Sequence, residues 1–584
     1  MRRKTIIIFC ALLCVLGCIS GVRAQGKPNV TLAYNRYYNY AGITEMFHDL
    51  VKTYPQFLSM ESIGKSIQGR DMWVVTINNP KTGPEESKAA MYIDADIHGN
   101  EVQGTETILY TVDYLMTCYG RNEKMTKLVD ERVFYLIPMV NPDGREHFFD
   151  RKHFGAGGRS GMAPTDNDND GLYDEDGYDD LDGDGLILQM RKKVASGRYR
   201  ISKEDDRIME RTPAGETGTY ELLGNEGIDN DGDGYVNEDG PGGYDMNRNW
   251  PTDWQPNYVQ YGAGDYPFSY PETRAIGRFI LDHPNIAGVQ SYHNSGGMIL
   301  RGPGDKDLGT YPAADRTVYD YIGKLGEEML PFYRYMILWK DLYTVHGGFV
   351  NWAAEGLGIF SFTNELWSSS QYANVSPPPP KPGEDRFATR ARQQVGRLKF
   401  DDYVEMGAQY VEWKPFTHPV YGEIELGGWV RETGRVPPLF MLEELCHRNT
   451  AFTLFHADQM PHVGIGDVDI TPLGGNIYRL WVTVANSRAM PTISAIAAKG
   501  KIVRPDIVTV EGSGITVLSA GEVEDRWNSR VSPITDRPER VILADGIPGN
   551  GSRTLQFIVS GKGSVRVTVD CVRGGMAGKT VRLR

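Results

Sequence analysis

Cysteine is scarce in this chain of 584 residues, which holds six, three of them within the first eighteen positions. The other three, Cys118, Cys446 and Cys571, form an odd and widely spaced set. Such a set excludes a disulfide framework, and it also excludes a zinc site built from thiolates. Export must therefore be argued from a targeting segment and not from cysteine usage.

Long apolar runs are also few. The run at residues 6–16 follows three basic residues and is too short to span a bilayer, and no later segment is apolar enough to do so. Small residues before Gln25 resemble a signal-peptidase site, so we predict a signal peptide over residues 1–24 and an exported protein, periplasmic or secreted. An alternative is open, because residues 15–18 resemble a lipobox that would anchor a lipoprotein at Cys18.

No basic patch stands out, which disfavours binding to nucleic acid. The net charge is −14, and the acidity is concentrated in two segments. Residues 166–185 carry ten acidic side chains and residues 229–240 carry five, and neither segment has a Lys or Arg. Acidity that is confined in this way argues for bound cations and not for a generally acidic surface.

Helical and strand patterns alternate over the first two thirds of the chain. We expect helices at 43–54, 101–116, 276–281 and 387–413, and strands at 72–77, 90–97, 133–140, 287–292 and 359–363. This alternation predicts an α/β domain over residues 33–413, with a mixed, mostly parallel sheet flanked by helices. Residues 414–461 are expected to be a connector with a short helix. Short β-rich runs after it predict an all-β sandwich domain over residues 462–584.

Three metal-binding side chains follow predicted strands. His98 and Glu101 are three residues apart where a strand gives way to a helix, and His293 follows another strand. Open α/β sheets bind their ligands at the carboxyl ends of strands. An isolated His-x-x-Glu pair is usually a surface helix pair, but a third ligand favours a shared metal. Three ligands of this kind leave one position open, which is typical of catalytic zinc.

These motifs and their order resemble those of the carboxypeptidase A family of zinc metallocarboxypeptidases over residues 33–413. The resemblance implies that His98, Glu101 and His293 bind one Zn²⁺, and that Glu365 is the general base that activates a zinc-bound water. The sequence His-Gly-Asn-Glu at 98–101 is associated with the regulatory branch of the family. The signal and the acidic insertions suggest a bacterial exported form.

The same resemblance implies roles for five further residues. Asn247 and Arg248 fall on the pair that grips the terminal carboxylate of the substrate, and Arg191, in Met-Arg-Lys, falls on the arginine that polarises the scissile carbonyl. Tyr343 falls on the tyrosine that caps the substrate. Val350 falls on the base of the specificity pocket, where a neutral side chain disfavours a preference for basic C-terminal residues.

The acidic segments contain near copies of one loop. Residues 166–177 and 229–240 match each other, and a half-copy lies at 180–185. Alternating acids with Gly at position six resemble EF-hand calcium loops, but Gly stands where a bidentate Glu is expected. We therefore predict calcium loops of another geometry, similar to thrombospondin-type and dockerin repeats, with a solvated acidic loop as the alternative. The predicted Ca²⁺ ligands are Asp166, Asp168, Asp170, Asp174, Asp180, Asp182, Asp184, Asp229, Asp231 and Asp233.

Together these features predict a zinc metallocarboxypeptidase that acts on peptides or proteins with a free C-terminus, with no transmembrane span and no oligomeric state indicated. A first alternative is an amidase or carboxypeptidase acting on peptidoglycan stem peptides, which the pocket and not the zinc site would decide. A second is a catalytically inert protein that binds peptides or glycans. The intact Glu365 and all three metal ligands argue against inertness.

Overall fold

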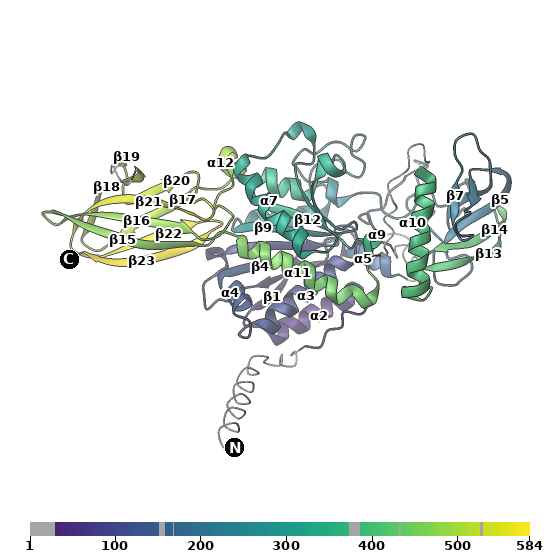
Figure 1. Ribbon diagram of the computed structural model, residues 1–584, viewed down its shortest axis with the longest axis horizontal. Helices are drawn as coiled ribbons and strands as arrows, with labels where there is room; N and C mark the ends of the chain where they lie inside the picture. The colour runs from purple at the N-terminus through teal and green to yellow at the C-terminus, as the bar shows by residue number, and fades with distance from the viewer. Residues whose placement is uncertain are drawn as a thin grey trace, which may run out of the picture. The chain divides into compact units, whose positions relative to one another are not determined.

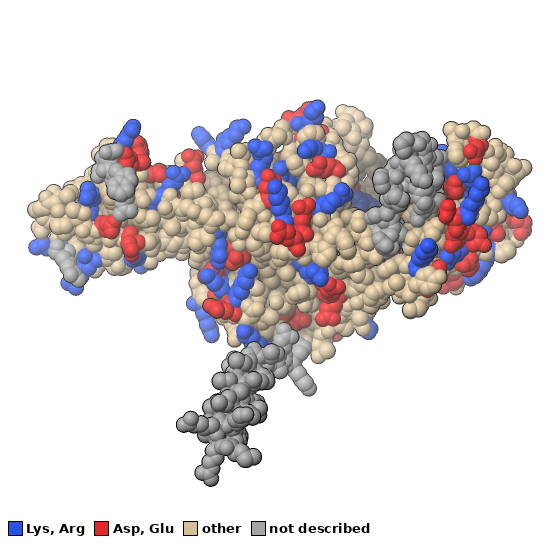
Figure 2. Space-filling view, viewed as in Figure 1, with Lys and Arg blue, Asp and Glu red and all other residues tan. Residues whose placement is uncertain are grey.

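The computed structural model describes residues 30–150, 158–167, 169–372, 386–430, 434–525 and 530–583 (Figure 1). The predicted signal peptide, Cys18 and Asp168 lie outside these residues. Within the described ranges, no helix is long and apolar enough to cross a membrane. The face drawn in Figure 2 carries Lys and Arg interspersed with Asp and Glu, so a continuous basic patch is absent from the described residues of that face.

The α/β part is built on an eight-stranded sheet with the order β1-β2-β4-β3-β9-β12-β10-β11. Neighbours β4, β3, β9 and β12 are parallel to one another, and β10 is parallel to β11, whereas the pairs β1-β2, β2-β4 and β12-β10 are antiparallel. This confirms the predicted mixed, mostly parallel sheet. The strands are β1 (Leu58–Lys65), β2 (Asp71–Ile77), β3 (Ala89–Ala95), β4 (Arg132–Ile137), β9 (Ile286–Asn294), β10 (Met298–Arg301), β11 (Arg334–Ile337) and β12 (Phe360–Leu366).

Helices bury both faces of this sheet. Every residue of β3, β4 and β9 is buried, as expected for central parallel strands covered on both sides. On one face, Tyr92 of β3 shares a core cluster with Ile276 of α6. Gly288 of the neighbouring strand β9 lies close to Met91 of β3 and to His456 of α11. The helices are α2 (Tyr40–Thr53), α3 (Gln103–Cys118), α4 (Glu123–Glu131), α5 (Pro142–Phe149), α6 (Pro271–Asp282), α7 (Ala313–Met329) and α11 (Leu442–Gln459).

The structure corrects the prediction for residues 387–461. The expected helix is α10 (Arg386–Phe400), and the chain leaves the helical conformation where Met406 and Gly407 adopt φ angles of 60° and 76°. The residues expected to form a connector contain two strands that were not predicted, and the short helix expected there is the longer α11, which packs against α3, α7 and β9. The last helix that packs against the eight-stranded sheet and its helices is therefore α11.

The two strands in that region belong to a second sheet that was not predicted, which we call the accessory sheet. It has six antiparallel strands in the order β13-β14-β5-β8-β6-β7 and lies beside α10 (Figure 1). Its members come from segments about two hundred residues apart. They are β5 (Gln189–Gly197), β6 (Tyr199–Ile201), β7 (Met209–Arg211), β8 (Gly218–Asn225), β13 (Tyr410–His418) and β14 (Gly422–Trp429).

The predicted β-sandwich is confirmed. One sheet has the order β15-β16-β21-β18-β19 and the other β20-β17-β22-β23, and alternate side chains form a shared core. Buried Arg573 donates to the carbonyls of Leu357 and Gly358, which joins this domain to the α/β part. The strands are β15 (Val463–Gly474), β16 (Ile477–Asn486), β17 (Asp506–Glu511), β18 (Ile515–Asp525), β19 (Arg530–Val531), β20 (Arg540–Leu543), β21 (Gly551–Gly561), β22 (Gly563–Cys571) and β23 (Gly575–Leu583).

Candidate active site

The three predicted metal ligands meet at the carboxyl edge of the central strands. His98 and Glu101 lie in the turn between β3 and α3, and His293 is the penultimate residue of β9, which pairs with β3. Nδ1 of His98 lies 3.0 Å from Oε1 of Glu101, and Nδ1 of His293 lies 2.9 Å from Oε2. All three side chains are buried, and their ligand atoms lie within 4.8 Å of one another.

This arrangement fits a zinc ion. Zinc–ligand bonds of about 2.0–2.2 Å place neighbouring ligand atoms roughly 3 Å apart. Each imidazole nitrogen lies at about this distance from its nearer oxygen of Glu101. The other nitrogen of His98, Nε2, lies 3.0 Å from Oδ1 of Asp245. Zinc-bound histidines commonly hold a carboxylate with the nitrogen that does not bind the metal. The donor set and this partner therefore suit one Zn²⁺ with an open position.

Asp245 was not found from the sequence, although it stands two residues before the predicted Asn247. Burial alone would raise the pKa of Asp245, but the charges of His98 and Arg248 outweigh burial and hold the pKa well below its usual range. The carboxylate therefore stays charged and keeps the His98 ring in one orientation. Oδ1 also accepts from the backbone N–H of Asn247 at 2.8 Å, which connects the metal ligand to the substrate-binding segment.

Glu365 lies beside the ligands because of strand pairing. It stands on β12, where its register partner on the parallel strand β9 is His293. Burial, followed by the charge of Glu101, raises the pKa of Glu365 to about 7, and His293, Arg159 and Arg435 oppose that rise. A carboxylate with a pKa near neutrality is well matched to accept and return a proton.

Two arginines contact the carboxylate of Glu101. Arg159 Nη1 donates to Oε1 of Glu101 at 2.9 Å, and its Nη2 lies 3.5 Å from Oδ2 of Asp245. Arg435 Nη1 donates to the same Oε1 at 3.2 Å and to the carbonyl of Asn294 at 3.1 Å. Neither arginine was predicted, because each enters from a loop with no local motif. The Arg159 side chain is 41% exposed, so solvent or a substrate can reach it.

Arg191 does not lie with these groups, which corrects its predicted role. It stands on β5 of the accessory sheet, where Nε donates to Oε2 of Glu425 at 2.7 Å. Its guanidinium carbon lies 4.2 Å from the ring centroid of Trp413 and 4.9 Å from that of Tyr220. A guanidinium held by a carboxylate and two aromatic faces is a structural cation. The arginines beside the predicted metal ligands are Arg159 and Arg435.

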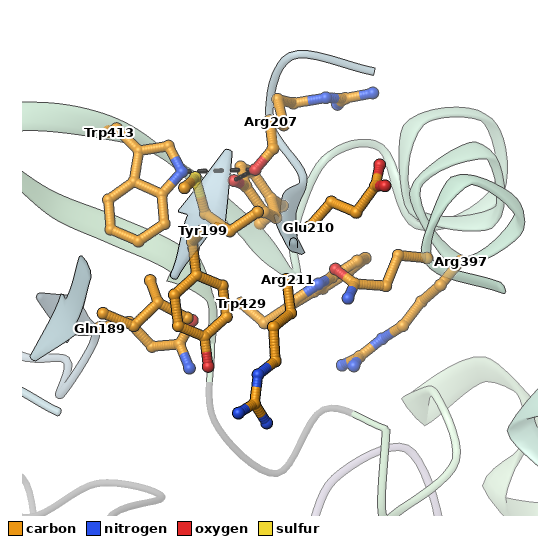
Figure 3. Close-up of a pocket in the computed structure, with 13 residues that line it drawn as sticks. Gln189, Tyr199, Arg207, Glu210, Arg211, Arg397, Trp413 and Trp429 are labelled. Atoms are coloured by element: carbon orange, nitrogen blue, oxygen red, sulfur yellow. Dashed lines mark hydrogen bonds between the residues drawn. The ribbon is translucent and has the colours of Figure 1, made fainter. Parts of the chain in front are cut away.

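Trp413 also lines a pocket of about 390 Å³ between the accessory sheet and α10, and Figure 3 shows its aromatic and arginine side chains. None of the predicted zinc ligands is among the lining residues, so this pocket is separate from the candidate active site. The lining residues that Figure 3 labels are Gln189, Tyr199, Arg207, Glu210, Arg211, Arg397, Trp413 and Trp429.

The predicted substrate residues occupy neighbouring segments. Asn247 and Arg248 form a short 3-10 turn (Met246–Arg248), and Oδ1 of Asn247 accepts from the N–H of Phe349 at 2.9 Å. The next residue along, Val350, is buried in the core cluster with Phe349 and Trp250. Tyr343 is 51% exposed and acts electrostatically on Arg159, so its ring lies at the rim of the site.

The three acidic loops share one local geometry. In each loop the first Asp accepts from the backbone N–H groups three and five residues later, as Asp229 does from Gly232 at 2.6 Å and Gly234 at 3.0 Å. In the second full copy, the predicted ligands Asp229, Asp231 and Asp233 converge within 4.8 Å. In the half-copy, Asp180 and Asp182 converge with Glu226, which was not predicted.

The predicted calcium ligand Asp174 is not among the acidic groups that converge in the described part of these loops. Its Oδ1 accepts from the backbone N–H of Thr165 at 3.0 Å and of Gly242 at 3.3 Å. The carboxylate therefore closes the base of the insertion. The neighbouring Glu175 lies instead with Asp170 and Asp231.

Comparisons with known proteins place the chain in a family. A family model described as zinc carboxypeptidase matches residues 43–182 and 199–385, and a domain of unknown function matches residues 462–582. Human carboxypeptidase D is 32% identical over 128 residues, which cover 22% of this chain and 9% of that protein. A zinc carboxypeptidase of Saccharothrix mutabilis subsp. capreolus is 30% identical over 123 residues, covering 21% and 28%.

Two further matches are a curated relative named as inactive and a solved structure. Inactive metallocarboxypeptidase ECM14 of Saccharomyces cerevisiae is 30% identical over 113 residues, covering 19% of this chain and 26% of that protein. Among solved structures, thrombin activatable fibrinolysis inhibitor aligns with a TM-score of 0.41 at 15% identity, over 74% of this chain and 78% of that one. The chain thus spans less than a third of the length of carboxypeptidase D, of the Saccharothrix enzyme and of ECM14.

Proposed function

Because the chain belongs to the zinc carboxypeptidase family, we propose that it is a zinc-dependent metallocarboxypeptidase that hydrolyses the C-terminal peptide bond of peptides or proteins. The observation that carries the proposal is the convergence of His98, Glu101 and His293 beside Glu365. A protein that only binds peptides has no need of a partly buried general base next to three metal ligands.

The proposed reaction divides the work between the metal and the chain. When bound, zinc supplies a Lewis acid that polarises the scissile carbonyl and makes the attacking water more acidic. The carboxylate of Glu365 takes a proton from that water and passes it to the leaving amine. Arg159, held beside Glu101 and Asp245, presents an exposed guanidinium that stabilises the negative charge developing on the carbonyl oxygen.

The terminal carboxylate of the substrate is assigned to Arg248 and Asn247. A guanidinium binds a carboxylate with two parallel hydrogen bonds, and this contact is stronger and more selective than a neutral one. The amide oxygen of Asn247 is engaged by Phe349 N–H, which directs the donor end of the amide away from that contact. Tyr343 is proposed to close over the bound substrate from the rim, and Val350 to limit the side chain that fits beneath it.

Replacing Arg248 by Ala is expected to raise KM for an N-blocked dipeptide with a free C-terminus by about 10- to 100-fold, with kcat changed less. Steady-state kinetics measure both constants. Arg248→Lys is the matched control, because it keeps the charge but loses the fork and should fall between wild type and Ala. Melting curves report whether each variant is folded. An unchanged KM in a folded, zinc-loaded Ala variant would remove Arg248 from carboxylate binding.

We further propose that the acidic loops bind Ca²⁺. Hard oxygen ligands in flexible loops suit calcium, and the repeated Asp and Gly positions give three similar turns. The insertion leaves the catalytic part just after Arg159 and returns just before Asp245, where Gly161 N–H donates to the carbonyl of Tyr244 at 2.9 Å. Bound calcium would therefore brace both residues. Export through a signal peptide at residues 1–24 is proposed from the sequence alone.

A further inference from the structure

The two full copies of the acidic loop pair with each other in a symmetric way. Asp176 and Asp239, the eleventh residues of the copies, form an antiparallel bridge. The second residue of each copy then binds the eleventh of the other: Asn167 N–H donates to Asp239 Oδ1 at 3.0 Å, and Asn230 Nδ2 donates to Asp176 Oδ1 at 2.9 Å. Equivalent residues are 63 positions apart, so the pair is a pseudo-twofold unit within one chain.

This pairing buries carboxylate oxygens that have no donor. Asp176 and Asp239 are fully buried. Within the described part of the chain, Oδ2 of Asp239 and both carboxylate oxygens of Glu175 and of Glu238 are shielded from solvent and have no hydrogen-bond partner. A shielded carboxylate without a donor or a cation is unfavourable, because it has lost its hydration. These oxygens therefore need a positive partner.

Each tenth-position glutamate faces the other copy. Glu175 interacts with Asp239 and Asp170, and Glu238 interacts with Asp176 and Asp233. The contacts again obey the 63-residue relation, so the two glutamates lie in equivalent clusters.

The cluster around Glu175 contains acids of both copies. Oxygens of Asp170 and Glu175, from the first copy, and of Asp231, from the second, lie within 4.8 Å of one another. Asp239 of the second copy adds the partnerless Oδ2. In the equivalent cluster, Glu238 and Asp233 of the second copy lie with Asp176 of the first.

We propose that the copies bind Ca²⁺ between them, with each ion held by carboxylates of both copies. Asp170, Glu175, Asp231 and Asp239 form one shared site, and Asp233, Glu238 and Asp176 contribute to its symmetry mate. This inference rests on the proposed calcium binding and goes beyond it. Glu175 and Asp239 become ligands, and the ions cross-link residues 166–177 to residues 229–240. Filling one site then organises the other.

The cross-link has a consequence for the catalytic part. Leu181 and Val236, from the acidic insertions, pack under the accessory sheet against Met190, Ile424 and Leu426. The same insertions begin after Arg159 and end before Asp245. Calcium held between the copies would therefore fix the two ends of the insertion, where Arg159 and Asp245 lie beside the predicted zinc ligands.

A double-mutant cycle tests whether the site is shared. Full-length, zinc-loaded protein is stripped of calcium with a calcium-selective chelator and titrated with Ca²⁺ by calorimetry. Glu175→Gln alters the first copy and Asp231→Asn the second. Each is expected to weaken the same binding event by about tenfold or more, and the double variant should be little worse than either single variant. Glu175→Gln combined with Asp184→Asn, in the half-copy, is the control and should give additive losses.

The outcomes separate this inference from the proposal on which it rests. Coupled losses in Glu175→Gln and Asp231→Asn support a shared site. Additive losses, with each variant weakening a different ion, would overturn the shared site while leaving loop-by-loop calcium binding in place. If wild type binds no Ca²⁺ and its melting temperature does not change on adding Ca²⁺, both the shared site and the calcium function are wrong. Thermal melting of each variant without calcium shows whether it is folded.

Discussion

Replacing Glu365 by Gln is expected to lower kcat by about 10²- to 10⁴-fold while the zinc content stays at one ion per chain. Glutamine has nearly the same shape as glutamate but cannot accept the proton of the attacking water. Glu365 is not one of the three converging metal ligands, so the metal should be retained. The comparison needs kcat and metal analysis on the same preparation.

His98→Ala is the matched contrast for this experiment. It removes a ligand, so it should lose activity together with zinc, whereas Glu365→Gln should lose activity alone. Activity within threefold of wild type in folded, zinc-loaded Glu365→Gln would show that another group is the base. The partly buried position of Glu365 opposite His293 would then have a structural role.

Substitution of the two candidate arginines is expected to give opposite results. Arg159→Ala should lower kcat/KM by about 10²- to 10³-fold, because removing one preorganised donor to a developing oxyanion has an effect of this size. Arg191→Ala should leave kcat/KM within a few-fold of wild type but lower the melting temperature, because it breaks the contact with Glu425 and the packing on Trp413. Arg435 also reaches Glu101 and limits the loss in Arg159→Ala.

The two arginine variants are measured side by side, for kinetics, zinc content and melting. A large loss of kcat in folded, zinc-loaded Arg191→Ala, with Arg159→Ala near wild type, would restore the role that the Met-Arg-Lys pattern suggested. Arg159→Lys is a useful third variant. It keeps the positive charge but not the planar group, and should recover part of the loss.

The convergence of His98, Glu101 and His293 could be predicted because their sequence signals are local. His98 and Glu101 are three residues apart, and His293 and Glu365 follow or end apolar strands whose carboxyl ends meet at one edge. Asp245 and Arg159 could not be found in this way. Their roles depend on contacts across the fold, with His98 and Glu101, and a single Asp or Arg in a loop carries no periodic pattern.

The accessory sheet escaped prediction for a similar reason. Its central pairing joins Arg191 to Glu425, more than two hundred positions apart, and the hairpin that supplies Glu425 lies between two helices. Strand patterns in those short segments were weak beside the strong helical pattern before them. The misassignment of Arg191 follows from the same long-range pairing, because a local three-residue match cannot show which sheet a strand joins.

The protein is proposed to remove residues from a free C-terminus by means of Glu365 and the buried site formed by His98, Glu101 and His293. The most direct test is hydrolysis by wild-type protein of N-blocked dipeptides that differ only in a free or an amidated C-terminus. The account predicts release of the terminal residue from the free acids at least about a hundredfold faster than from the amides. Equal cleavage of the two series would contradict carboxylate recognition by Arg248 and Asn247, and with it the assignment as a carboxypeptidase.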